Sequence, residues 1–111
     1  MFKIDPEPTF SAEAALTVPG QAEPARLTIH WKHLSRDQLV EWIDGLAQIR
    51  LGDVDGLALV VAGWEGVVDQ QGQAVPFTKD RLRSLLWSYH AAGAELVRAY
   101  VRALTESRLG N

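Results

Sequence analysis

Apolar and polar side chains alternate along the first part of the chain, in two runs separated by a loop. The loop, residues 19–24, contains two prolines and a glycine, which interrupt regular structure. Alternation with a period of two places every second side chain on the same face of a strand. The two runs therefore predict a β-hairpin within residues 1–34. The apolar positions are Phe10, Ala12, Ala14, Leu16 and Val18 in the first run and Leu27, Ile29 and Trp31 in the second.

The spacing changes to that of a helix after Ser35. Ser35 and Gln38 have the form of a capping box, in which each residue bonds the backbone N–H of the other. Apolar residues then recur at intervals of three and four, which predicts a helix from about Arg36 to Arg50, ended by Gly52. The positions of this stripe are Leu39, Ile43, Leu46 and Ala47, with Trp42 and Ile49 beside it.

A second helix is predicted from Asp53 to about Trp64. Asp53 is a suitable N-cap, and Val54, Leu57, Val61 and Trp64 follow at steps of three, four and three. The sequence Asp53-Val54-Asp55-Gly56 resembles part of a calcium loop but lacks the remaining oxygen ligands. We therefore interpret Asp53 as a helix cap.

Residues 65–77 are rich in turn formers. Asp69 and Gly72 occupy the first and fourth positions of a type I turn, which predicts a small hairpin or tight loop. Thr78 can cap a third helix, and a last helix ends before Gly110. The third helix has the stripe Leu82, Leu85, Leu86 and Tyr89, and the last has Leu96, Val97, Tyr100, Val101 and Leu104.

Together these elements predict an α+β protein of one domain, residues 1–111. A β-hairpin region, residues 1–34, precedes a mainly helical region of about four helices, residues 35–111, with the turn motif at 65–77. The longest apolar stretch, residues 57–62, is far shorter than the roughly 18 residues that indicate a membrane helix. We expect no contact with a membrane.

Charge is divided unevenly along the chain, although the formal net charge is only −3. Residues 1–78 carry 5 Lys/Arg and 11 Asp/Glu, whereas residues 79–111 carry 6 Lys/Arg and 3 Asp/Glu. A broadly basic surface for nucleic acid is therefore not expected. An acidic body and a basic end favour self-association or a protein partner, and two solvated faces that differ in charge are the alternative.

The residue types that usually build catalytic and metal-binding sites form no recognisable motif in this sequence. The chain has no cysteine, which excludes disulfides, thiolate metal sites and cysteine nucleophiles. The three histidines, His30, His33 and His90, are not at metal-ligand spacing. No nucleophile elbow, phosphate-binding glycine loop or carboxylate pair is present. We expect neither an enzyme nor a cofactor.

The four tryptophans are the most informative residues for binding, because tryptophan is favoured at interaction hot spots. Trp42 and Trp87 lie on apolar helical stripes, which predicts that they belong to the core. Trp31 and Trp64 each end a predicted element, so they are candidates for contact with another chain. Core packing is the alternative for both.

The central motif carries a resemblance to a known family. Gly63-Trp64 is followed by Val-x-Asp-x-x-Gly-x-x-Val-Pro-Phe-Thr at residues 67–78, then by a Leu-Leu helix and by a helix containing Ala99-Tyr100. This arrangement resembles the tail assembly chaperones of long-tailed bacteriophages and prophages. Family members often have acidic residues inside the turn, where this chain has Gln70 and Gln71.

The resemblance implies a protein that is not an enzyme. Such chaperones bind the tape-measure protein, help recruit tail-tube subunits around it, act in the cytoplasm of the host bacterium and are absent from the mature virion. The alternative is a minor virion component such as a head–tail connector. Candidate partner-binding residues are Trp31, Trp64, Val67 and Val68, and the open hairpin edges and divided charge favour a homo-oligomer.

Overall fold

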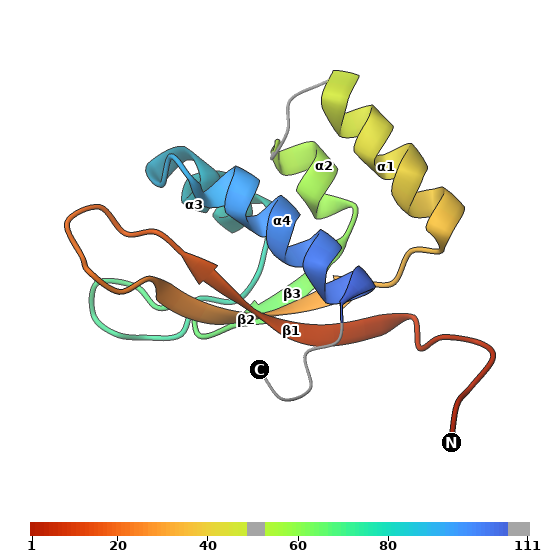
Figure 1. Ribbon diagram of the computed structural model, residues 1–111. Helices are drawn as coiled ribbons and strands as arrows, with labels where there is room; N and C mark the ends of the chain where they lie inside the picture. Colours follow the sequence, from red (N-terminus) through yellow and green to blue (C-terminus); the bar gives the residue numbers. More distant parts are fainter. Residues whose placement is uncertain (49–52, 107–111) are drawn as a thin grey trace.

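The computed structural model describes residues 1–48 and 53–106 and contains a three-stranded antiparallel sheet with four helices (Figure 1). The strands are β1 (Thr9–Leu16), β2 (Ala25–Lys32) and β3 (Val61–Glu65), in the order β1-β2-β3. The helices are α1 (Arg36–Gln48), α2 (Val54–Ala58), α3 (Lys79–Ser88) and α4 (Ala92–Thr105). The α+β class is confirmed, but a simple N-terminal hairpin followed by helices is wrong, because the third strand lies among the helices.

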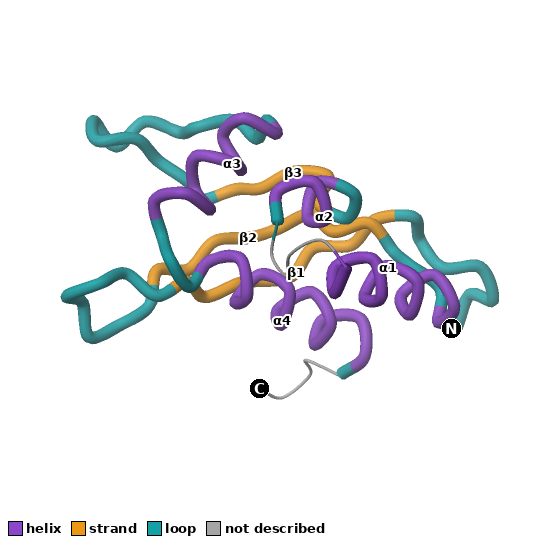
Figure 2. The backbone as a smooth tube through the Cα atoms, turned by 90° about the horizontal axis from the view of Figure 1, so that it is seen from above, coloured by secondary structure: helices purple, strands orange, loops and turns teal. Residues whose placement is uncertain are grey.

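The predicted hairpin is confirmed, and its alternation sets the inner face of the sheet. β1 and β2 pair over their full length, with Phe10 opposite Trp31 and Ala14 opposite Leu27. The even spacing of apolar side chains turns them to the face covered by α1, α2 and α4 (Figure 1). α3 lies toward the β3 side of the sheet when the molecule is seen from above (Figure 2).

β3 replaces the second half of the predicted second helix. α2 ends at Ala58, and Trp64 pairs with Ile29 while Val61 pairs with Trp31. A register shift leaves Ala62 as an extra residue, so Val61 and Trp64 both reach the core although their odd spacing would place them on opposite faces of a regular strand. Spacing by three is also helical spacing, which is why the pattern was misleading.

Helix starts are confirmed where the sequence carries capping residues. The Ser35 N–H donates to Gln38 Oε1 (2.9 Å) and the Gln38 N–H donates to Ser35 Oγ (3.3 Å), which completes the capping box of α1. Asp53 caps α2 by accepting the Asp55 N–H (2.9 Å). The predicted end of the first helix at Arg50 and Gly52, and Gly110 after the last helix, lie outside the described residues.

An aromatic cluster joins the sheet to the helices. The Tyr100 ring of α4 lies 4.8 Å from Trp31 of β2 and 5.2 Å from Trp42 of α1, between ring centroids. The Tyr100 hydroxyl donates to the Lys32 carbonyl (2.6 Å), and the Trp42 indole N–H donates to the Gly56 carbonyl (2.9 Å). Burial raises the pKa of Tyr100 to about 12.

Close packing of α1 on α2 depends on Gly56. A Cβ atom at this position would lie 2.2 Å from Leu46 Cδ2, too close for any side chain without displacement of Leu46. Trp42, as predicted, belongs to the core. The prediction that Trp87 is also buried is wrong, because its side chain is 89% exposed on α3. Leu82, Leu85 and Leu86 already occupy the inner face of that helix, which turns Trp87 to solvent.

Candidate partner-binding surface

The motif after β3 forms a small hairpin closed by Asp69. The Asp69 carboxylate accepts the N–H groups of Gln71 (2.9 Å) and Gln73 (3.0 Å), and the Gly72 N–H donates to the Asp69 carbonyl (3.0 Å). Gly72 has φ +77°, a conformation that side-chain-bearing residues rarely adopt. The Val75 N–H donates to the Val67 carbonyl (2.8 Å) and closes the hairpin. The predicted turn is thus confirmed.

Trp64 and Phe77 hold this hairpin against the core. The Trp64 indole N–H donates to the Val75 carbonyl (2.7 Å), and the Trp64 and Phe77 rings meet edge to face with centroids 5.0 Å apart. One residue beyond Phe77, the Thr78 hydroxyl accepts the Arg81 N–H (3.0 Å) and begins α3 as predicted. The turn therefore leads directly into α3, the helix beside it.

Two adjoining hollows lie between this hairpin, α3 and the end of the β1–β2 hairpin. They have volumes of about 680 and 270 Å³ and share the same four apolar walls. We call this feature the Val68 groove. Its shared walls are Val67, Val68, Leu85 and Tyr89, the larger hollow also includes Trp64, Val75 and Arg81, and the smaller includes Leu16, Val18 and Leu27.

The four candidate binding residues separate into two pairs by burial. Trp31 is completely buried and Trp64 is only 7% exposed, so neither side chain is itself open to a partner. Val67 is half-buried, whereas Val68 is 59% exposed at the rim of the groove. The structure brings Trp64, Val67 and Val68 together and places Trp31 elsewhere, in the aromatic cluster with Tyr100.

Sequence reasoning missed the groove wall formed by α3. Leu85 and Tyr89 looked like parts of an apolar stripe that would be buried, yet both line the hollows and Tyr89 remains 37% exposed. Leu16 and Val18 were assigned to the strand alone. Spacing along one element could not show that the ends of three elements meet at one place.

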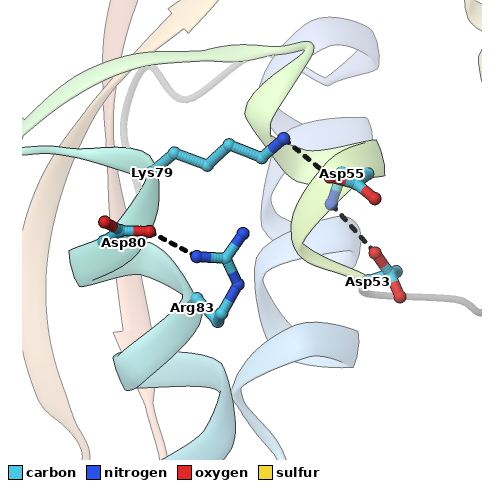
Figure 3. Close-up of polar contacts among 5 residues, drawn as sticks. All are labelled: Asp53, Asp55, Lys79, Asp80 and Arg83. Carbon is cyan, nitrogen blue, oxygen red and sulfur yellow. Dashed lines mark hydrogen bonds and ion pairs between the residues drawn. The ribbon is translucent and has the colours of Figure 1, made fainter.

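One exposed ion pair links α3 to α2 (Figure 3). Lys79 Nζ lies 2.7 Å from Asp55 Oδ1, and the Lys79 ammonium lowers the pKa of the Asp55 carboxyl by hydrogen bonding and by its charge. Arg83 pairs with Asp80 one turn earlier on the same helix. Asp53 and Asp55 thus serve as a cap and an ion-pair partner, in agreement with the interpretation of Asp53 as a cap.

The outer face of the sheet carries a polar chain that crosses all three strands. Ser11 Oγ lies 2.6 Å from His30 Nδ1, and His30 Nε2 lies 2.9 Å from Glu65 Oε2. Ser11 and His30 are 19 residues apart in the chain, and no local pattern predicts that their side chains meet. The two contacts link β1 to β2 and β2 to β3 on this face.

No group of side chains suited to a metal ion occurs in residues 1–48 and 53–106. Within the same residues, no helix has the length and apolar character needed to cross a bilayer. The shared walls of the Val68 groove are apolar, and an apolar groove of this kind suits an apolar peptide or an amphipathic helix.

The sequence as a whole matches a family described as phage tail assembly chaperone, over residues 1–111. The chain belongs to this family. Comparisons with curated proteins and with solved structures gave no match. Membership confirms the resemblance carried by the motif at residues 67–78, and it assigns the protein to phage tail assembly. The Val68 groove, built by that motif, is the candidate contact surface of this tail assembly chaperone.

Proposed function

We propose that the chain binds the tape-measure protein through the Val68 groove and helps to recruit tail-tube subunits around it. The observation that carries this proposal is the exposed apolar rim at Val68, built by the residues that resemble the family motif. Val68 continues the apolar walls of the groove into solvent, and a contiguous apolar surface of this kind is typical of a protein interaction site. A chaperone needs such a surface while its client is unassembled.

The groove matches the chemistry of an extended helical client. Its walls come from Val67, Val68, Leu85 and Tyr89, with Arg81 and Asp69 at its margin. An amphipathic helix can place its apolar face in such a groove and leave its polar face in water. The interaction requires no catalytic group or cofactor, and we propose that it takes place in the host bacterial cytoplasm and leaves no copy of the chain in the mature virion.

The test is co-expression of the tape-measure protein with this chain. The wild-type chain should increase the soluble fraction of the tape-measure protein and elute with it in gel filtration. Val68→Asp should abolish the complex, because a charge would lie on the apolar rim. Leu59→Asp is the matched control: Leu59 is 67% exposed but lines none of the groove, so this variant should bind normally.

Two results would contradict the proposal. One is a tape-measure protein that is equally soluble without the chain. The other is an equal loss of binding in the Val68 and Leu59 variants, which would show that the groove has no special part. Detection of the chain in purified particles would instead favour a virion component.

A further inference from the structure

Within residues 1–48 and 53–106, β1 forms a long edge of the sheet that no other strand covers. In the order β1-β2-β3, β1 pairs only with β2, so its other side is open along 8 residues. An open edge pairs readily with another chain, and proteins usually protect it with proline, charge or a bulge. β1 contains no proline, pairs with β2 in continuous register and has Glu13 as its single charged residue. The other edge, β3, has only 5 residues and a register shift, so β1 is the better template for an added strand.

The hydrogen-bond pattern shows which backbone groups of β1 face the open side. The His33 N–H donates to the Pro8 carbonyl across the β1–β2 pair (2.9 Å), and alternate residues of an antiparallel strand face the same neighbour. The even-numbered residues of β1 therefore bond to β2, and the odd-numbered residues point away from it. Just beyond the strand, the outward N–H of Thr17 donates to Glu95 Oε1 of α4 (2.9 Å). The outward residues of β1 that have no backbone partner among the described residues are Thr9, Ser11, Glu13 and Ala15.

α4 runs along this edge in the direction opposite to β1. Thr17, after the end of β1, bonds to Glu95 in the first turn of α4, and Phe10 near the start of β1 shares a hollow with Ala103 and Leu104 in the last turn. Seen from above, α4 lies beside β1 on the side away from β2 (Figure 2). The edge and the helix together border a further hollow of about 260 Å³. We call this feature the β1 edge site.

Small side chains keep the β1 edge site open, and two arginines of α4 border it. Arg98 and Arg102 line the hollow, and both side chains are exposed. Arg98 has no ion-pair partner among the described residues, and Arg102 makes one contact of 3.8 Å with the exposed Glu106. The small side chains of the hollow are Ala14, Ala15 and Ala99.

The two carboxylates that line the β1 edge site already have partners. Glu95 accepts the N–H (2.9 Å) and the hydroxyl (2.6 Å) of Thr17, and Glu13 Oε1 lies 3.0 Å from Arg26 Nη1. The charge that remains available is therefore that of the two α4 arginines. A guanidinium group matches a carboxylate best, because it donates two parallel hydrogen bonds to it. The site thus suits an acidic ligand.

The spacing of the two arginines matches that of side chains on a strand. Arg98 and Arg102 are one turn apart, which separates them by about 6 Å along the helix axis. Side chains on the same face of a β-strand are about 7 Å apart. A strand added to β1 would turn every second side chain toward α4, so successive acidic side chains on that face would each meet one arginine.

We propose that the β1 edge site binds an extended acidic segment of another protein as an added strand. The backbone of the segment continues the sheet through the outward groups of β1, and its acidic side chains pair with Arg98 and Arg102. A second copy of this chain fits less well, because an antiparallel pair of β1 strands would place the arginines of both copies side by side. The four shared walls of the Val68 groove do not line the β1 edge site, so this proposal does not rest on the proposed tape-measure contact.

Binding of labelled peptides, measured by fluorescence anisotropy, tests the proposal. The probe is a peptide of 8 residues, the length of β1, in which glutamate alternates with threonine (the acidic peptide). It should bind the wild-type chain, and higher salt should weaken binding because solvent screens the charges. A peptide with lysine in place of glutamate should not bind. A copy of the acidic peptide that is methylated on every backbone nitrogen should not bind either, because it keeps the charge but cannot pair as a strand.

Two variants separate the contributions of charge and backbone. Arg98→Glu with Arg102→Glu (the arginine variant) reverses the charge of the site, and Ala15→Pro removes an outward N–H without removing a bond to β2. Each variant should bind the acidic peptide at least about tenfold more weakly than the wild type. Circular dichroism checks folding, and the arginine variant leaves β1 itself unaltered.

The matched control is Lys79→Glu with Arg83→Glu on α3. It changes the net charge by the same amount as the arginine variant, at side chains that are more than half exposed and do not line the β1 edge site. It should bind the acidic peptide as the wild type does. Equal losses in the control and the arginine variant would show that only net charge matters and would overturn the proposal.

Hydrogen exchange measured by NMR locates the bound peptide. The backbone amides of Ser11, Glu13 and Ala15 should be protected when the acidic peptide binds, because they then belong to a ladder. Absence of binding, equal binding of the methylated peptide, or protection confined to residues 66–75 would overturn the proposal. Tighter binding of an oligothymidylate than of the acidic peptide would assign the arginines to nucleic acid and would overturn it as well.

Discussion

Two regions of the molecule use their apolar side chains in opposite ways. In the sheet and α4, the apolar side chains Ile29, Trp31, Leu96 and Tyr100 are almost completely removed from solvent. In the region from Gly66 to Tyr89, Val68, Trp87 and Tyr89 remain exposed, and turns, caps and ion pairs maintain the structure. The first region stabilises the fold, whereas the second exposes the apolar side chains that we propose a partner covers.

Truncation of an apolar side chain should affect the free energy of unfolding very differently in the two regions, and this is the largest difference that we expect. Ile29→Ala should lower the free energy of unfolding by about 2–5 kcal/mol, because a buried side chain leaves a cavity. Val68→Ala should change it by less than about 0.5 kcal/mol, since the Val68 side chain is largely in water. Urea denaturation of both variants measures this. Equal losses would show that the groove region is as much a part of the core as the sheet.

High pH should weaken the sheet region through Tyr100. Its pKa is about 12 in the fold, above the value of 10.0 expected in the unfolded chain. The neutral phenol therefore stabilises the fold fully below pH 10, and this contribution of about 1–3 kcal/mol is lost as the pH rises through 12. Denaturation at pH values between 9 and 12 measures the decline.

The control for this pH effect is Tyr100→Phe. The variant lacks both the titrating hydroxyl and its hydrogen bond to Lys32, so it should be less stable at neutral pH but should show a flatter decline above pH 10. A decline of the same size in both proteins would assign alkaline unfolding to other groups.

Substitution of Gly72 in the second region and of Gly45 in α1 should change the free energy of unfolding in opposite directions, by smaller amounts. Gly72→Val should lower the free energy of unfolding by about 1 kcal/mol or more, because Gly72 has positive φ. No atom lies within 4 Å of an added Cβ, so the cost comes from the backbone and not from a steric clash. Gly45→Ala in α1 also meets no atom within 4 Å but has an ordinary helical backbone, so it should stabilise by up to about 1 kcal/mol. Thermal denaturation compares them. An unchanged melting temperature for Gly72→Val would contradict the account of the turn.

Local signals in the sequence predicted those elements that short-range chemistry determines. The capping box of Ser35 and Gln38, the cap at Thr78 and the turn from Asp69 to Gly72 all depend on atoms within a few residues of each other. These features appeared in the structure at the expected positions. The turn from Asp69 to Gly72 also forms the hairpin that carries Val68, so the sequence predicted this wall of the groove but not the wall formed by α3.

Long-range pairing was beyond the reach of the same signals. β3 was missed because a single extra residue, Ala62, lets Val61 and Trp64 face the same side of a strand at helical spacing. Trp87 was assigned to the core because periodicity marks apolar positions without showing how many of them neighbouring elements can cover. Both errors concern contacts between residues far apart in the chain.

Hydrogen–deuterium exchange with and without the tape-measure protein tests the central claim most directly. Binding should slow exchange in residues 66–75 and in α3, with little change in β2 or α4. Slower exchange confined to α1 or α4, with residues 66–75 unchanged, would contradict the assignment of the Val68 groove as the client surface.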